Sequence, residues 1–285
     1  MSIRQGTLYV VATPIGNLED LSARARDVLA NVTLIAAEDT RHSRKLLERH
    51  EIKAPLQAYH EFNEQEAAPG LLEHLRKGHD IALISDAGTP LISDPGYRLV
   101  DMAMTQGVPV VPIPGPSAPI CALSVCGLPV NRFAFEGFAP EKATERRKYL
   151  QDLAVETRTL VFLEAPHRIV GLLADCVAAF GAERPGTLAR ELTKKFETVR
   201  RDTLGRLLQW VSADPEQRQG EFVVVIQGAQ EEPNPDLANS ARVLLVLMQY
   251  LSVKDAAAAA AQLTGRKRNE LYALAVRLKS EAQSR

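Results

Sequence analysis

The chain has 285 residues, 46% of them hydrophobic, so it is long enough for two domains and apolar enough for well-packed cores. The net charge of −1 excludes a protein that is basic throughout, although a local basic patch can still bind nucleic acid. Cys121, Cys126 and Cys176 lack metal-ligand spacing and are typical of reduced core residues in a cytosolic protein. The start, MSIRQGTLYVV, lacks the apolar core of a signal peptide, and no apolar run has membrane-spanning length. We therefore expect a cytoplasmic protein without a membrane partner.

The first part of the chain alternates short apolar runs with helical patterns. The predicted strands, each ending in turn residues, lie at 8–17, 32–40, 81–90 and 108–117. The predicted helices lie at 19–32, 43–51, 64–78, with an interruption near Pro69 and Gly70, and 95–107. This alternation predicts βαβ units and a parallel sheet. Because ligands of such sheets bind beyond the carboxyl ends of the strands, we expect the four strand ends to converge on one crevice.

Two of these strand ends are rich in Gly and Pro: SDAGTP at 85–90 and IPGPSA at 113–118. Gly88 permits close backbone approach or a positive φ, and Asp86 offers a carboxylate. Ser117 is placed to cap the helix that follows. Such loops suit a ligand with a ribose, an amino group or a positive charge, although both are also compatible with plain strand-to-helix turns. Further on, we expect Asp94 to be the N-cap of the next helix and not a ligand contact.

The pattern changes near residue 118, where an apolar helix is predicted over 118–128. Beyond it, strands are predicted at 133–138, 158–166, 185–193, 196–204 and 221–228, with helices at 141–154 and 167–181. Several of these strands follow one another without a helix between them, which indicates a mixed sheet. The sequence therefore predicts an N-terminal α/β domain over 1–118 and a second, mixed-sheet α/β domain over 119–230.

The last part of the chain is helical in pattern. An acidic, Pro-containing stretch at 229–240 is typical of a linker. Helices are predicted at 241–252, 253–265 and 266–281. From Asn239 to the end there are eight Lys/Arg and three Asp/Glu, a net charge of 8 − 3 = +5. The run of alanines at 256–261 favours helix. We therefore predict a basic helical module over 239–285.

Four charged stretches each allow two interpretations. The segment AAEDTRHSRK at 36–45 is either a polar rim around the crevice or the start of a solvated helix capped by Thr40 or Ser43. The stretch YHEFNE at 59–64 is either a proton-transfer site with His60 and Glu61 or an ordinary surface loop. The stretch EAPHR at 164–168 opens a helix, and the cations in its first turn, which the helix dipole disfavours, favour an anion contact over a plain helix start. The basic run at 190–201 is either an RNA-facing edge or a solvated strand pair. The histidines are scattered without ligand spacing, so we predict no metal site.

Together these motifs resemble a known family. VATPIGNLEDLSARA at 11–25, EDTRHSRKLL at 38–47, YHEFNE at 59–64, ISDAGTPLISDPG at 84–96, IPGPSA at 113–118, FEGFAP at 135–140 and EAPHR at 164–168 carry the resemblance. The family is small-subunit ribosomal RNA methyltransferase I, within the tetrapyrrole-methylase-like enzymes that use S-adenosylmethionine (SAM). The resemblance implies two α/β domains with SAM in the cleft between them, a homodimer, and 2′-O-methylation of a cytidine in the decoding region of 16S ribosomal RNA, within the small ribosomal subunit.

The resemblance also implies a SAM pocket. Carried over by motif, the SAM-contacting residues are Ile15, Ser85, Asp86, Ala87, Gly88, Thr89, Ser117, Ala118, Phe162, Leu163, Ala189, Arg190 and Phe222. The first loop, TPIGN at 13–17, lacks the Gly-rich sequence of the tetrapyrrole and diphthine enzymes, which argues against a tetrapyrrole substrate.

The remaining candidates concern catalysis and RNA. Asp39, His60, Glu61 and Asp86 are candidates for a general base. The candidate RNA contacts are Arg41, His42, Arg168, Lys194, Arg266, Lys267 and Arg268. The last three begin a helix after a Leu-Thr-Gly turn at 263–265, a pattern that resembles a helix-turn-helix but also fits an ordinary helical hairpin. Two alternatives stay open: a methylase of the same group with a tetrapyrrole or protein substrate, and a ligand-sensing helix-turn-helix regulator.

Overall fold

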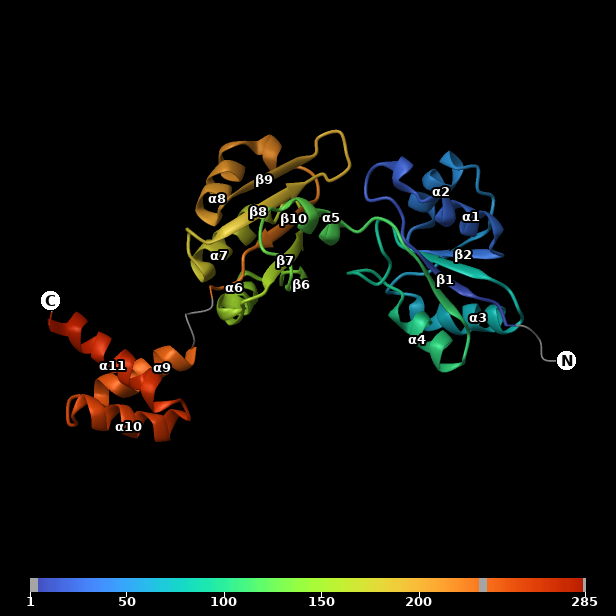
Figure 1. Ribbon diagram of the computed structural model, residues 1–285. Coiled ribbons are helices and arrows are strands. Elements are labelled where there is room, and N and C mark those ends of the chain that lie inside the picture. Colours follow the sequence, from blue (N-terminus) through green and yellow to red (C-terminus); the bar gives the residue numbers. More distant parts are fainter. Residues whose placement is uncertain (1–4, 231–234, 284–285) are drawn as a thin grey trace. The chain divides into compact units, whose positions relative to one another are not determined.

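The computed structural model describes residues 5–230 and 235–283. The chain forms two compact units, Met1–Gly228 and Ala229–Arg285, which Figure 1 traces in the colours of the sequence. The first unit contains two five-stranded sheets, and the second contains helices only. The predicted boundary near residue 118 falls inside the first unit, between its two sheets, and the division of that unit into two domains stays a prediction.

The first sheet is parallel and has the strand order β3-β2-β4-β1-β5. Its strands are β1 (Leu8–Val11), β2 (Leu34–Ala37), β3 (Leu56–Ala58), β4 (Ile81–Ile84) and β5 (Val110–Ile113). The central strand β4 is buried along its whole length, and β1 pairs with both β4 and β5 in parallel register. The sequence did not predict β3, because only three half-buried residues form it.

Four helices cover the two faces of this sheet, as the labels in Figure 1 show. The helices α1 (Ala23–Asn31) and α2 (Thr40–Arg49) pack one face, through a core that includes Leu29 and Leu47. The helices α3 (Glu64–Arg76) and α4 (Tyr97–Thr105) pack the other, through Leu71 and Leu99. A short 3₁₀ turn, η1 (Leu18–Asp20), precedes α1.

Three predictions about these helices are wrong. Helix α2 starts at Thr40 and not at 43, because Asp39 and not Thr40 or Ser43 is its N-cap. Helix α3 runs through Pro69 without interruption, and apolar residues on both sides of Pro69 in this helix are buried in the core. Helix α4 is preceded by Gly96, with a φ of 133°, so Asp94 is not its N-cap.

The second sheet is mixed and has the strand order β6-β7-β10-β8-β9. Its strands are β6 (Phe133–Phe138), β7 (Thr159–Glu164), β8 (Pro185–Arg190), β9 (Thr198–Thr203) and β10 (Phe222–Ile226). Only β6 and β7 pair in parallel, and the other neighbours are antiparallel. Together with the first sheet, this confirms the predicted fold class.

The two faces of the second sheet have different covers. Helices α6 (Ala143–Asp152), α7 (Ile169–Phe180) and α8 (Leu204–Ala213) bury one face. Helix α5 (Ala118–Val125) packs on the other face, together with Ile15 and Leu192. The sequence did not predict α8, and α7 starts after His167 and Arg168 and not before them. Short 3₁₀ turns, η2 (Leu153–Val155) and η3 (Pro215–Arg218), complete this region.

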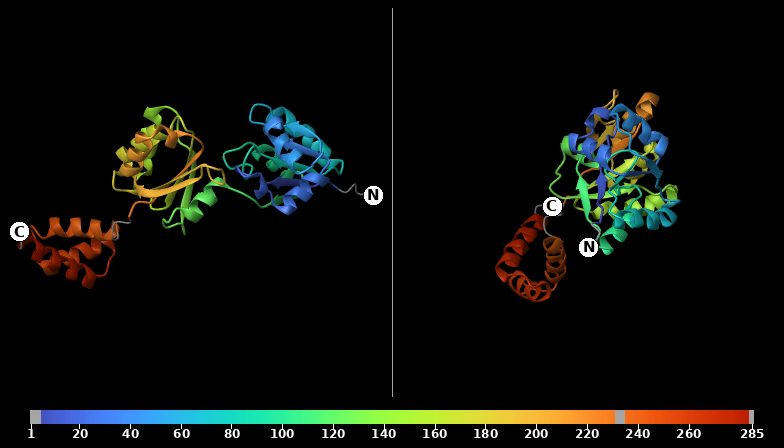
Figure 2. Two further views of the ribbon diagram at one scale, coloured as in Figure 1. Left: turned by 90° about the horizontal axis from the view of Figure 1, so that it is seen from above. Right: turned by 90° about the vertical axis from the view of Figure 1, so that its right-hand side faces the viewer.

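The second unit consists of α9 (Pro235–Leu247), α10 (Val253–Thr264) and α11 (Arg268–Gln283). Both views in Figure 2 show these helices gathered as one group. Small buried residues such as Ala257 and Ala260 let α10 approach its neighbours, and Gly265 ends α10 in the left-handed conformation.

Two boundaries predicted for this region differ from those in the structure. The predicted linker at 229–240 is too long, because α9 starts at Pro235, a residue that suits a first helical turn; 231–234 lie outside the described residues. Arg266 and Lys267 precede α11 instead of starting it. In the parts of the chain that the structure describes, no helix combines the length and apolarity needed to cross a membrane.

Candidate cofactor cavity and its surroundings

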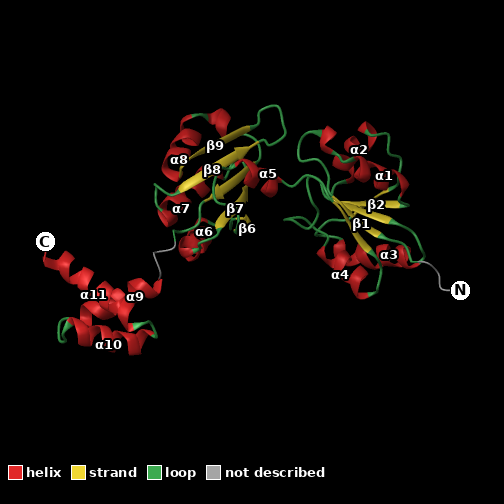
Figure 3. Cartoon of the chain, viewed as in Figure 1, coloured by secondary structure: helices red, strands yellow, loops and turns green. Residues whose placement is uncertain are grey.

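A cavity of about 470 Å³ lies in the first unit. Many of the residues that line it belong to loops that follow strands of the two sheets; Figure 3 draws the loops in green. The first sheet and its loops contribute Ile15, Glu38, Asp86, Ala87, Gly88, Thr89, Ile92, Ser93 and Asp94. The segment at the start of α5 contributes Ser117, Ala118 and Pro119. The second sheet and its loops contribute Phe138, Leu163, Glu164, Ala165, Pro166, Ala189, Leu192, Glu221, Phe222 and Val223. This volume is within the range of about 300–1,000 Å³ that is usual for small-molecule and cofactor sites.

Backbone hydrogen bonds join the strand-end loops that line the cavity. Thr13 and Gly88 exchange two of them, at 2.8 and 3.0 Å. The Thr89 hydroxyl donates to the carbonyl of Pro116 at 3.0 Å, which ties the loop after β4 to the loop after β5. Gly88 has a φ of 84°, and a Cβ there would lie 3.3 Å from Ile15 Cγ2. The predicted convergence of these strand ends is confirmed.

Three carboxyl groups from the first sheet's loops meet at the cavity: Glu38, Asp86 and Asp94. The Asp86 amide donates to Glu38 Oε2 at 3.4 Å, and Asp86 Oδ1 accepts from the Asp39 amide at 2.9 Å. Burial raises the pKa of Glu38, and the charges of Asp94 and Asp86 raise it further. Burial likewise raises the pKa of Asp94, although the Ser85 hydroxyl lowers it in part. Burial and the charge of Asp86 therefore disfavour the ionised forms of Glu38 and Asp94.

Two further carboxyl groups come from the second sheet: Glu164 and Glu221. Burial raises the pKa of Glu164, although the Ala165 amide donates to it at 2.9 Å and Arg168 Nε lies 3.1 Å away. Among the described residues that line the cavity, five carry a carboxyl group and none is Lys, Arg or His. Such a lining suits a ligand that carries positive charge and disfavours one that carries phosphates.

Sequence comparisons extend over most of the chain. A sequence profile described as Tetrapyrrole (Corrin/Porphyrin) Methylases matches residues 7–208, and one described as RsmI C-terminal HTH domain matches residues 234–279. The protein named Ribosomal RNA small subunit methyltransferase I from Pseudomonas aeruginosa is 53% identical over 269 residues, which cover 94% of this chain and 95% of that protein. Its namesake from Escherichia coli O157:H7 is 51% identical over 274 residues, with 95% of each chain covered. The chain belongs to the ribosomal RNA small subunit methyltransferase I family.

Solved structures show the same fold at low sequence identity. Uroporphyrin-III-C-methyltransferase from Thermus thermophilus matches with a TM-score of 0.56 and 23% identity, over 78% of this chain and 94% of that one. Diphthine synthase matches with a TM-score of 0.59 and 14% identity, over 78% and 90% of the two chains. These likenesses support the architecture that the family shares.

Most of the predicted SAM contacts line the cavity. They are Ile15, Asp86, Ala87, Gly88, Thr89, Ser117, Ala118, Leu163, Ala189 and Phe222. Ser85 is buried beside Asp94 without lining the cavity. The side chain of Phe162 packs in the core under α6, α7 and α8, because alternation along β7 turns Leu163 and not Phe162 toward the α5 face.

Arg190 also lies away from the cavity lining. It is 8% exposed, and its guanidinium donates to the carbonyls of Glu216, Gln219 and Phe196. Ser117 occupies the N-cap position of α5, but its side chain makes no capping hydrogen bond.

Sequence reasoning missed several residues of the cavity, and Asp94, which it expected only as a helix N-cap, is one of them. The loop before α4 has positive φ angles at Leu91 (73°) and Ser93 (67°), which redirect the chain so that Asp94 lines the cavity. Glu38 and Glu164 stood in motifs that the sequence singled out, whereas Glu221 carried no signal of its own.

The three catalytic candidates outside the SAM set do not line the cavity. Asp39 caps α2 by accepting from the Arg41 amide at 2.8 Å, and hydrogen bonds from Arg41 lower the pKa of Asp39. Glu61 is exposed, and its charge acts on Glu38. The ring of His60 contacts Phe62, with 6.1 Å between ring centroids. A catalytic role for any of the three stays a prediction.

The candidate RNA contacts fall into two groups. Arg41 and His42 on α2, Lys267 just before α11 and Arg268 at its start are exposed. The others are held by carboxylates of the chain: Arg168 is 15% exposed next to Glu164, Lys194 is paired with Glu191 and Glu221, and Arg266 with Glu270.

Proposed function

We propose that the protein is a SAM-dependent methyltransferase of small-subunit ribosomal RNA, and that it methylates the ribose 2′-oxygen of a cytidine in the decoding region. The family supports the first part, because the relatives are named for that activity on the small-subunit RNA. The choice of oxygen and nucleotide rests on the sequence resemblance alone.

The observation that carries the proposal is the charge of the cavity. SAM carries a positive sulfonium and an ammonium group, and its ribose offers hydroxyls to carboxylates. The cavity presents Glu38, Asp86 and Asp94 on one side and the apolar Ile15, Leu163 and Ala189 near them. The volume, the carboxyl groups and the apolar wall fit a nucleoside with a cationic tail better than they fit a phosphate-bearing cofactor.

When bound, SAM supplies a methyl carbon that is already electrophilic. The work left to the chain is to align the ribose hydroxyl, exclude water and accept a proton as the hydroxyl reacts. Of the four general-base candidates, Asp86 is the one that lines the cavity. We assign proton acceptance to it, with its carboxylate oriented by the Asp39 amide.

The RNA contacts that we propose lie on two exposed basic surfaces. The first is the start of α2, where Arg41, His42, Arg44 and Lys45 are exposed directly after the cavity residue Glu38. The second is formed by Lys267 and Arg268 in the C-terminal unit, whose profile match carries a helix-turn-helix description. Cations on these surfaces would hold the phosphates that flank the target nucleotide.

We also propose that the protein works as a homodimer on the small subunit in the cytoplasm. The α5 face of the second sheet supports association, because apolar side chains stay exposed there. Ile120 and Val125 on α5 are 54% and 53% exposed, and Phe133 and Val199, on the two edge strands, are each 39% exposed. Exposed apolar side chains on one face of a sheet can mark a protein–protein contact.

The test is mass spectrometry of 16S ribosomal RNA nucleosides from cells with and without the protein. The expected result is one 2′-O-methylcytidine in the decoding region that is lost in the deletion strain and restored by the wild-type chain. An unchanged nucleoside profile would reject the RNA substrate, and methyl transfer to a porphyrinoid by the purified protein would favour the tetrapyrrole alternative.

A further inference from the structure

The loop that follows β8 has an unusual backbone. Glu191 and Thr193 have φ angles of 53° and 66°, a region that non-glycine residues rarely occupy and that is costly for a β-branched residue. Residues in such conformations are strained and persist only when their surroundings hold them. We call residues 191–194 the 191–194 loop.

This loop contacts the loop after β1. The Asn17 amide donates to the Thr193 hydroxyl at 3.1 Å, and a Cβ on Gly16 would lie 2.4 Å from Lys194 Cγ. Next to these contacts, Ile15 and Leu192 belong to one buried cluster, and both line the cavity. The contact between the two loops therefore closes one side of the cavity.

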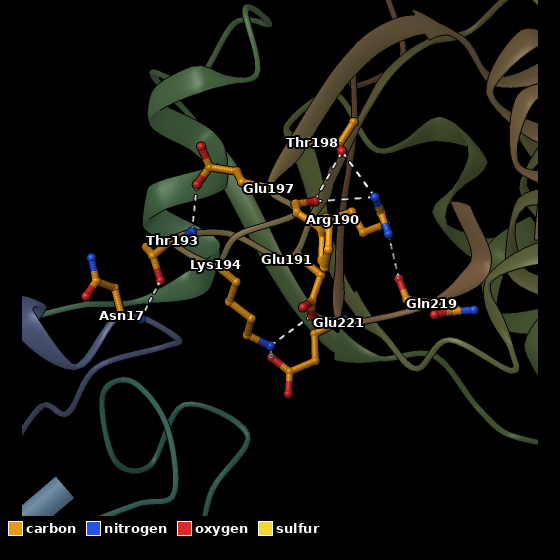
Figure 4. Close-up of polar contacts among 10 residues, drawn as sticks. Asn17, Arg190, Glu191, Thr193, Lys194, Glu197, Thr198, Gln219 and Glu221 are labelled. Carbon is orange, nitrogen blue, oxygen red and sulfur yellow. Dashed lines mark hydrogen bonds and ion pairs between the residues drawn. The ribbon is translucent and has the colours of Figure 1, made fainter. Parts of the chain in front are cut away.

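Lys194 and two carboxylates hold the 191–194 loop in place, as Figure 4 shows. Lys194 Nζ lies 2.9 Å from Glu191 Oε1 and 3.1 Å from Glu221 Oε2. The Glu221 amide also donates to Glu191 Oε1, at 2.9 Å. Gly220 makes room for this arrangement, because a Cβ there would lie 2.3 Å from Glu191 Cγ. Lys194 is thus linked to Glu221, a residue of the cavity wall.

The charges argue against a phosphate contact for Lys194. One ammonium with two carboxylates has a net charge of +1 − 2 = −1. Burial lowers the pKa of Lys194, but its hydrogen bonds to Glu191 and Glu221 outweigh burial and raise it. The Lys194 ammonium therefore stays charged and paired with the two carboxylates. Its neighbour Lys195 is exposed over the ring of Phe196, and in the described parts of the chain no carboxylate is paired with it.

We propose that Lys194 is a positioning residue for the cofactor cavity and not an RNA contact. Through Glu191 and Glu221 it holds the 191–194 loop against residues 15–17, so that Ile15 and Leu192 form a closed wall. This inference rests on the proposed function, because SAM is the ligand that the wall would enclose.

The experiment compares two adjacent lysines in the full-length protein. SAM affinity is measured by calorimetry, and affinity for small-subunit RNA by filter binding, for Lys194→Met and Lys195→Met. Lys194→Met should lower SAM affinity about tenfold, because it removes two charge-assisted hydrogen bonds, and should leave RNA affinity unchanged. Lys195→Met should leave SAM affinity unchanged.

Further variants separate positioning from general damage. Lys194→Arg retains donors for both carboxylates and should keep SAM affinity within about threefold of wild type. Lys194→Met combined with Glu221→Gln should lose less affinity than the product of the two single losses, because the two residues share one contact. Gly16→Ala, which would push Lys194 and Thr193 away, should also lower SAM affinity.

The outcomes are distinct. The inference is overturned if Lys194→Met binds SAM like the wild type, or if it weakens RNA binding with SAM binding intact. A loss in Lys194→Met that multiplies with the loss in Glu221→Gln also contradicts it. Failure of the wild-type protein to bind SAM would instead reject the proposed function.

Discussion

The cavity and the start of helix α2 are adjacent in the chain and opposite in character. Glu38 lines the cavity among other carboxyl groups, whereas Arg41, Arg44 and Lys45, a few residues on, are exposed. The segment 38–45 therefore begins in the acidic, partly buried cavity wall and becomes a basic exposed surface within two helical turns. The difference supports the ligands that we propose: the wall suits the cationic cofactor, and the surface suits the phosphates of RNA.

The same contrast separates cations that look alike in sequence. Arg168 and Lys194 stand in basic or polar loops, yet each is paired with a carboxylate and mostly removed from solvent. Among the residues that the structure describes, Arg41 pairs with the neighbouring Asp39 alone, and its side chain is 90% exposed. Exposure and pairing, and not the residue type, distinguish a cation that can meet RNA from one that stabilises a loop.

The largest effect is expected at the acidic wall. Asp86→Ala removes both a carboxylate of the cavity and the acceptor for the Asp39 amide, so SAM affinity should fall about a hundredfold. Asp86→Asn is the matched control, because it keeps an acceptor oxygen and removes only the charge. It should lose less SAM affinity than Asp86→Ala. Calorimetry measures both, and unchanged affinity in Asp86→Ala would refute the assignment of the cavity.

The basic surface should show the reverse pattern. Replacing Arg44 and Lys45 together by Ala should weaken RNA binding about tenfold near 0.1 M salt, and should reduce the slope of log K against log salt by about 1.4 to 1.8. SAM affinity should be unchanged. Filter binding across a salt series provides the measurement, and a parallel loss of SAM affinity would show that the two regions are not separate.

The pH dependence of SAM binding tests the wall without mutation. The raised pKa values of Glu38 and Asp94 mean that the free protein holds these protons to higher pH than an unfolded chain does. A bound cation favours the ionised forms, so SAM affinity should fall about threefold to tenfold between about pH 8 and about pH 5. Asp94→Asn should flatten this profile.

The same linkage affects stability with a defined sign. At a pH above the raised pKa values, the ionised carboxylates of Glu38 and Asp94 lower the free energy of unfolding of the protein without SAM. This destabilisation is lost as the pH falls through the raised pKa values toward the ordinary ones. A SAM affinity that rises toward low pH would contradict the acidic wall.

The smallest effect is expected in the C-terminal unit. Replacing Lys267 and Arg268 by Ala should weaken RNA binding about threefold, because two of several phosphate contacts are lost. Lys254→Ala is the matched control: it is also an exposed cation of this unit, but it lies at the start of α10. Equal losses in both variants would indicate a general charge effect and not a defined contact.

Much of the cavity could be predicted, because its loops follow strands whose alternation with helices is visible in the sequence. Alternating strands and helices predict a parallel sheet, and a parallel sheet places Asp86, Gly88 and Ser117 at one edge. Each of these residues also stands in a turn whose Gly or Pro is visible in the sequence. The short strand β3 and the helix α8 escaped prediction, because the first has three half-buried residues and the second directly follows β9.

The parts that escaped prediction depend on contacts distant in sequence. The pairing of Lys194 with Glu221 spans 27 positions, and it arises because β8 and β10 are antiparallel neighbours that bring Arg190 opposite Phe222. The position of Asp94 at the cavity depends on positive φ angles at Leu91 and Ser93. Neither residue type predicts such an angle. Backbone strain and strand pairing, and not local motif, put these side chains at the cavity.

One measurement tests the central claim, that the acidic cavity serves methylation of small-subunit RNA. Small subunits from cells lacking the protein are incubated with methyl-labelled SAM and either the wild-type protein or Asp86→Ala. We predict that the wild type labels the 2′-oxygen of one decoding-region cytidine and that the variant labels almost none. Absence of label with the wild type, or equal labelling by the variant, would contradict the account.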